Sequence, residues 1–155
     1  MKSSTQITNG TPFVARFASW KLWVASAVIF VPFAWMFFAS TAPFAIPEVE
    51  AACGQAPPDM RFFTAADGVT QFLDDCGTNG RDTYRNMQLA DIFYPAIIGV
   101  FLASSLSLTI KRLSPQPGRT LWLAALPLAA MAFDYLENVL AWLALTSYPD
   151  PIATT

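Results

Sequence analysis

Apolar residues are gathered in three long blocks, at residues 20–40, 89–110 and 121–145. Each block is close to the ~20 residues that a helix needs to cross a bilayer. The pattern predicts an all-α membrane protein with three transmembrane helices in an antiparallel bundle and a partly helical outer loop. In this single membrane domain the expected spans are residues 19–41, 88–110 and 120–146, and the segments between and around them are 1–18, 42–87, 111–119 and 147–155.

Composition agrees with this pattern, because hydrophobic residues make up 54% of the chain and charged residues only 13%. A soluble domain carries roughly a quarter charged residues. The charges are also unevenly distributed. Segment 1–18, the start of the first span and segment 111–119 carry basic residues and no acid, namely Lys2, Arg16, Lys21, Lys111, Arg112 and Arg119. We expect a multi-pass protein of a bacterial inner membrane, and the positive-inside rule predicts that its N-terminus and segment 111–119 lie in the cytoplasm.

The same rule places segment 42–87 and the C-terminal tail in the periplasm. Both cysteines, Cys53 and Cys76, fall in segment 42–87, where disulfides persist. We therefore expect them to form a disulfide. There is no CxxC spacing that would indicate a redox motif or a zinc site.

Helices are also expected within this outer segment. Residues 42–59 contain four prolines and are predicted to form extended coil. A helix is expected after Thr64 as N-cap, with Phe72 and Leu73 on its apolar face. A second helix is expected to begin near Arg81 and to continue without a break into the second span.

The third apolar block contains an unusual polar stripe. Asp134, Glu137 and Asn138 are spaced by three and four residues, which puts them on one helix face. An acid at the bilayer centre costs about 2.5–3.5 kcal/mol on insertion scales. The stripe must therefore face something polar. One hypothesis is structural: Asp134 and Glu137, in their protonated form, hydrogen-bond serine hydroxyls or backbone groups that Pro95 or Pro127 leaves free.

A second hypothesis adds Asp91, about one turn below the outer end of its own span. Asp91 and the stripe would then line a cavity open to the outer face, with Arg81 and Arg85 at its rim. Carboxylates and an amide oxygen would suit a hard cation, a proton relay or a polar headgroup. A third hypothesis is that the stripe docks onto a partner subunit.

Several chemistries are excluded by residue type. The chain has no histidine, which excludes His-ligated haem or chlorophyll and di-iron Glu-x-x-His sites. No Gly-rich phosphate loop and no nucleophile beside a base is recognisable, so we expect neither catalytic residues nor a metal site, and no cofactor is indicated. Basic residues are too few and too scattered for a nucleic-acid partner.

One set of residues resembles a pattern found in small, uncharacterised bacterial multi-pass membrane proteins. The residues are Gly80-Arg81, Tyr84, Asp91, Tyr94-Pro95, Asp134, Glu137-Asn138 and Tyr148-Pro149. The resemblance covers roughly the second half of the chain. It implies a membrane-embedded bundle with an acidic stripe, and it implies no activity. Such proteins continue into a fourth span, and Asp150-Pro151 is accordingly expected to begin a short outer helix or a further span.

These observations favour an accessory, non-catalytic subunit of a larger bacterial inner-membrane complex of the respiratory or photosynthetic kind. Its partners would be membrane lipids and other integral membrane subunits. The alternative is a small carrier or membrane enzyme that uses the intramembrane acidic stripe on a cation, a proton or a lipid headgroup.

Overall fold

The protein is described here by a computed structural model, which covers residues 13–61, 65–114 and 120–149. Every regular element in these ranges is a helix. Three helical segments of the described chain are long and apolar enough to cross a membrane: Trp20–Ala39, Asp67–Leu113 and Leu121–Ser147. The prediction of an all-helical chain with three span-length apolar helices is confirmed. The expected N-cap Thr64, most of the N-terminal tail and the segment from Asp150 lie outside the described residues.

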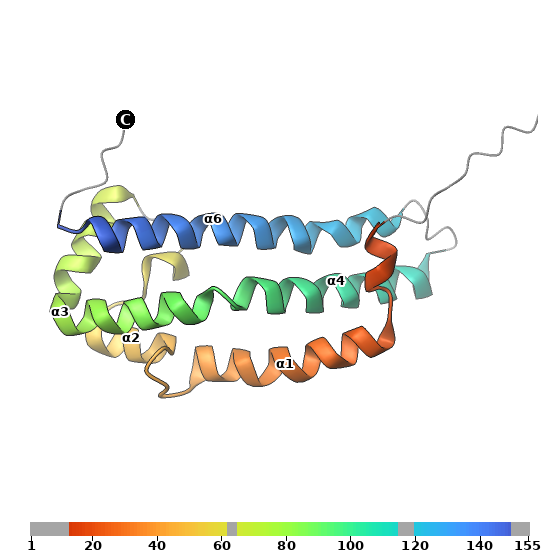
Figure 1. Ribbon diagram of the computed structural model, residues 1–155, viewed down its shortest axis with the longest axis horizontal. Coiled ribbons are helices and arrows are strands. Elements are labelled where there is room, and N and C mark those ends of the chain that lie inside the picture. Colours follow the sequence, from red (N-terminus) through yellow and green to blue (C-terminus); the bar gives the residue numbers. More distant parts are fainter. Residues whose placement is uncertain (1–12, 62–64, 115–119, 150–155) are drawn as a thin grey trace, which may run out of the picture.

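The three long helices lie side by side, with α4 between the other two (Figure 1). They are α1 (Trp20–Ala39), α4 (Tyr94–Leu113) and α6 (Leu126–Ser147), and successive helices run in opposite directions. Two short 3₁₀ helices, η1 (Phe13–Phe17) and η3 (Leu121–Ala125), pack against each other and against α4 at one end.

Aromatic side chains join α1 to α4. The rings of Phe30 and Phe101 stack with centroids 4.8 Å apart, and those of Phe37 and Tyr94 stack at 5.5 Å. Offset ring pairs of this kind are a favoured arrangement of aromatic side chains. The two helices are also joined by a hydrogen bond, because the indole N–H of Trp23 donates to Ser105 Oγ at 2.9 Å.

The other end of the molecule carries a helical cap, which we define as α2 (Ile46–Cys53), η2 (Pro58–Met60) and α3 (Ala66–Asp91). Gly77, with φ 60°, bends α3 in the middle, a conformation that costs glycine little. The two arms of α3 fold around a hydrophobic core. Its buried members are Phe37, Ile46, Val49, Cys53, Phe72, Leu73, Cys76, Tyr84, Met87 and Leu145.

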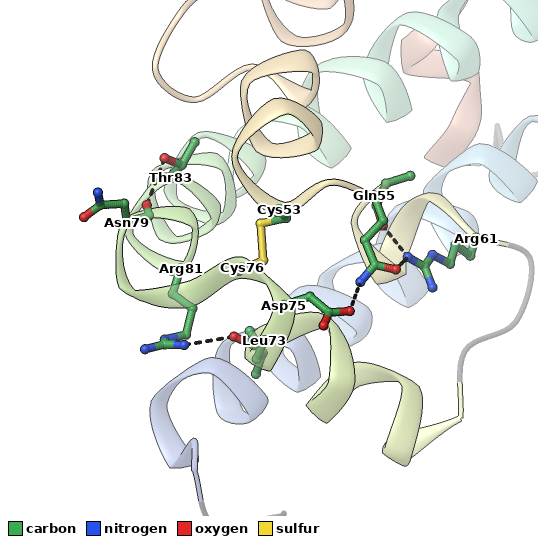
Figure 2. The surroundings of a disulfide bond; sticks show 10 residues. Cys53, Gln55, Arg61, Leu73, Asp75, Cys76, Asn79, Arg81 and Thr83 are labelled. Atoms are coloured by element: carbon green, nitrogen blue, oxygen red, sulfur yellow. Dashed lines mark hydrogen bonds between the residues drawn. A yellow bond between two sulfur atoms is a disulfide. The ribbon is translucent and has the colours of Figure 1, made fainter.

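The expected disulfide is confirmed. Cys53 and Cys76 are bonded, with an S–S distance of 2.08 Å, and the bond ties the end of α2 to the first arm of α3 (Figure 2). Gly80 lies directly against it. A Cβ at position 80 would stand 3.0 Å from Cys53 Sγ, so the close approach of the two segments requires glycine here.

The prediction of extended coil over residues 42–59 is wrong, because α2 lies within it. Pro47 occupies the first turn of α2, where a proline N–H is not needed. Glu48 stands in the same turn, where its charge complements the helix dipole. Gly54, with φ 71°, ends the helix in the left-handed conformation. Pro47, Glu48 and Gly54 are thus helix signals that can be read from the sequence, although the four prolines of residues 42–59 favour coil.

The expected passage from the outer helix into the second apolar block is confirmed in its course, since Asp67–Leu113 forms one helical segment and Ile92 and Phe93 keep right-handed helical dihedral angles, but its hydrogen bonds are interrupted. The helix hydrogen-bond pattern stops at Asp91, and a turn at Ile92 and Phe93 precedes α4. Pro95 lies at the start of α4 and has no N–H to donate to the carbonyl four residues earlier, which is that of Asp91. The break therefore leaves one backbone acceptor free at the junction between cap and span.

Candidate functional site

The free carbonyl of Asp91 is met by a residue of the polar stripe. Asn138 on α6 donates from Nδ2 to Asp91 O at 3.2 Å. A buried carbonyl that has no hydrogen-bond partner costs about 1–3 kcal/mol. Asn138 therefore fills the hydrogen-bonding gap that Pro95 creates, whereas the structural hypothesis gave this role to Asp134 and Glu137.

The acids of the stripe lie near this contact. Asp91 is 7% exposed, Asp134 is half-buried, and Glu137 is exposed. The carboxyl groups are close enough for Asp134 and Glu137 each to act electrostatically on Asp91. Among the described residues, neither Asp134 nor Glu137 forms a hydrogen bond or an ion pair. The structure thus brings Asp91 together with the stripe, while Glu137 faces outward.

A fourth acid joins this group from the cap. Asp59 in η2 accepts a hydrogen bond at 3.2 Å from Gln88 Nε2, which also donates to the Tyr84 hydroxyl at 3.0 Å. Burial raises the pKa of Asp59 from 3.8 to about 6, and the nearby charges of Glu137 and Asp134 add to the increase. We call Asp59, Asp91, Asp134 and Glu137 the carboxyl cluster.

Sequence reasoning missed Asp59 and Gln88. For Gln88 a signal existed, because Tyr84, Gln88 and Asp91 are spaced by four and three residues and so share one face of α3. For Asp59 there was none beyond its place after two prolines, because the approach of η2 to α3 is a contact between segments far apart in the chain.

Two buried polar atoms of this network have no hydrogen-bond partner among the described residues. They are Oδ1 of Asp59 and Oε1 of Gln88, and Gln88 is only 2% exposed. Native structures satisfy most buried polar atoms. A proton on Asp59, donated to a neighbouring oxygen, would supply a missing partner in a network that is otherwise rich in acceptors.

A metal site is not preformed here. In the described part of the chain no group of three or more His, Cys, Asp and Glu residues is arranged to hold a metal ion. The four carboxyl groups interact electrostatically without converging on one point. Coordination of a divalent cation needs several oxygens at roughly 2.0–2.6 Å from one point.

The two arginines expected at the rim lie in a neighbouring pocket. Arg81 and Arg85 line a hollow of about 450 Å³ between α3 and the end of α6, together with Thr78, Asp82, Thr146 and Tyr148. The guanidinium of Arg81 lies 4.6 Å from the centre of the Tyr148 ring, and its Nη1 donates to Leu73 O at 2.9 Å (Figure 2). No member of the carboxyl cluster is among the residues that line this hollow.

Comparison with known proteins gives no relative: no family model matches the chain, and neither a curated protein nor a solved structure matches it. The carboxyl cluster, the arginine pocket and the exposed helix faces are therefore the features from which a function can be inferred.

Proposed function

We propose that this protein is an integral protein of a bacterial inner membrane and that its carboxyl cluster takes up and releases protons from the outer, periplasmic side. The observation that carries the proposal is the position of Asp59. Asp59 belongs to the cap, outside the long apolar helices. It nevertheless accepts a hydrogen bond from Gln88, and the charges of Asp134 and Glu137 raise its pKa. It thereby connects acids of the apolar helices to the polar end of the molecule.

Electrostatics supports proton exchange. Carboxyl groups that repel one another in a poorly hydrated region cannot all be ionised, so protons are held by the group as a whole and leave it in coupled steps. Asp59, with its pKa raised to about 6, would change its charge just below neutral pH. The orientation rests on the basic segments 1–18 and 111–119, which favour the cytoplasmic side.

The test is proton binding by the purified protein in lipid nanodiscs. A weakly buffered sample is titrated with acid through the neutral range, and a pH-sensitive dye reports the free proton concentration. We expect the wild type to take up more protons than the double variant Asp134→Asn with Glu137→Gln. The amides keep polarity and shape but cannot carry a proton.

The matched control is Glu48→Gln with Glu50→Gln, which removes the same charge from α2, away from the cluster. This control should take up as many protons as the wild type over that range. Equal proton uptake by the wild type and by the Asp134 and Glu137 amide variant would refute the proposal, provided that both variants keep the wild-type helix content and thermal midpoint.

A second candidate function, that of an accessory subunit of a larger membrane complex, is favoured by Glu137. This exposed acid is surrounded on α6 by apolar side chains that are exposed as well: Phe133, Leu136 and Leu140. Facing lipid, a carboxyl group here would cost about 2.5–3.5 kcal/mol. A partner helix that covers this face and offers a hydrogen bond to Glu137 would remove that cost.

This candidate predicts a discrete contact in native membranes. A photo-crosslinking side chain at Leu140 should yield one heavier protein band, whereas the same group at Val28, on the exposed face of α1, should yield lipid adducts. In mild detergent the chain should then migrate with a large complex. Lipid adducts alone at Leu140, together with migration as a small homo-oligomer, would contradict the subunit role.

A further inference from the structure

The arginine pocket is a second polar site, independent of the carboxyl cluster. It lies where α3 passes the C-terminal end of α6, and its polar lining residues are Thr78, Arg81, Asp82, Arg85, Thr146 and Tyr148. The hollow of about 450 Å³ is open toward the outside of the protein and not closed within the helices. It therefore offers two guanidinium groups to a ligand that approaches from the surface.

Arg81 is held in place by groups that do not neutralise its charge. Its Nη1 donates to the backbone oxygen of Leu73, its Nη2 lies 3.5 Å from Thr78 Oγ1, and its guanidinium stands over the Tyr148 ring. The hydroxyl group of Tyr148 in turn donates a hydrogen bond to Asp74 Oδ1, and this hydrogen bond raises the pKa of the phenol. These contacts fix the orientation of the Arg81 guanidinium at the pocket wall.

Arg85 is by contrast free to turn. Its one ion pair within the described residues is to Asp82 at 3.5 Å, and the two side chains are 50% and 65% exposed. An ion pair with so much solvent around it contributes little. Both Arg85 and Asp82 line the pocket, so Arg85 can leave Asp82 for a stronger anion at small cost.

The depth of the pocket points to the source of that anion. Thr146 is part of the last turn of the apolar segment Leu121–Ser147, and Tyr148 is the first residue after this segment. If this segment spans the membrane, the pocket lies at the level of the lipid headgroups, where tyrosine is enriched. Phosphate groups are abundant at that depth, and guanidinium groups bind them through paired, charge-assisted hydrogen bonds.

We propose that the arginine pocket binds the phosphate group of a phospholipid headgroup in the outer leaflet, with Arg81 as the fixed donor and Arg85 as the mobile one. The glycerol and acyl chains of that lipid would lie along the exposed apolar surface near the end of α6. The bound lipid would fill the space between α3 and α6 and so tie the cap to the third long helix.

Native mass spectrometry of the full chain, purified in mild detergent and titrated with phosphatidylethanolamine, tests this assignment. Arg85→Gln should weaken lipid binding by about tenfold, in line with the loss of one charge-assisted contact. Arg85→Lys should recover only part of the loss, because the ammonium lacks the planar fork.

The control is Arg61→Gln, a change of equal charge in the same cap. Arg61 donates to Gln55 and to the backbone oxygen of Ala56, outside the pocket (Figure 2). The Arg61→Gln variant should bind lipid with the affinity of the wild type. Equal lipid affinity in the wild type and in the Arg85→Gln and Arg61→Gln variants would overturn the proposal. Saturable binding of inorganic phosphate without any lipid binding would overturn the lipid assignment.

Discussion

The cap is less apolar than the long helices, and the two regions use their apolar residues differently. In the cap, Phe72, Tyr84 and Met87 are almost wholly buried, around a disulfide. The 22-residue helix α6 buries Leu145 alone and leaves large side chains such as Phe133 exposed. The cap thus resembles the interior of a water-soluble protein, whereas α6 presents its side chains outward.

This difference indicates two sources of stability. Burial in the cap removes apolar area from water, at about 25 cal/mol per Å². Along a membrane span the surrounding lipid tails are as apolar as leucine, so little is gained by moving such a side chain from lipid to protein. Substitutions in the cap should therefore be costly, and matched substitutions on the α6 face should not.

The sharpest test of this contrast compares two phenylalanines. Phe72→Ala removes a ring that is 0% exposed and should lower the free energy of unfolding by about 3–5 kcal/mol. Phe133→Ala removes a ring that is 71% exposed and should leave stability in lipid nanodiscs nearly unchanged. Thermal midpoints in nanodiscs provide the measurement. Equal losses for the two variants would mean that α6 is covered by protein and is not bathed in lipid.

The disulfide should have the next largest effect. It joins residues 23 positions apart, for which the chain-entropy model gives roughly 3 kcal/mol. Replacing Cys53 and Cys76 together by alanine should lower the thermal midpoint and speed proteolysis within the cap, while α1 and α6 stay protected. Reductant should reproduce the loss in the wild type and do nothing to the double variant. Unchanged proteolysis would show that the cap holds together without its covalent tie.

The pH dependence of stability tests the interaction of Asp59, in the cap, with the acids of α6. Its folded pKa of about 6 exceeds the ordinary 3.8, so the folded state holds the proton more tightly than the unfolded chain does. Its contribution to stability is therefore greatest below pH 3.8 and is lost as the pH rises toward 6. Asp59→Asn should flatten that slope and stabilise the protein at neutral pH by about 3 kcal/mol. A slope that is unchanged in the variant would place the titration elsewhere.

Asn138 offers the smallest and most specific test. Asn138→Leu should cost about 1 kcal/mol, because the Asp91 carbonyl loses its donor. In a Pro95→Ala background the alanine N–H can serve that carbonyl, so the same substitution should cost little. A double-mutant cycle on thermal stability measures the coupling. Additive effects would show that Asn138 does not compensate for Pro95.

The features that could be predicted from the sequence depend on residue type and on spacing within short stretches of the chain. Apolar block length located the helices, compartment chemistry paired Cys53 with Cys76, and helical spacing put Asn138 on the stripe. What it missed depends on contacts between distant segments. Asp59 reaches the carboxyl cluster only because η2 folds against α3, and the path of a proline-rich segment is not encoded in any periodicity. The α2 helix was not predicted because four prolines in residues 42–59 favour extended coil, whereas Pro47 lies in the first turn and is compatible with a helix start.

Because Leu145 lies near the end of the chain, the hydrophobic core of the cap is completed late in synthesis. Most members of the cap core, from Phe37 to Met87, emerge from the ribosome before any residue of α6, whereas Leu145 and its neighbour Tyr148 come from the end of that helix. The cysteines can pair as soon as both have been synthesised. The core around them nevertheless stays open on one side until α6 is in place. A nascent chain stalled before Leu145 would thus display Phe72 and Leu73 to chaperones and proteases, and completion of α6 would cover these side chains.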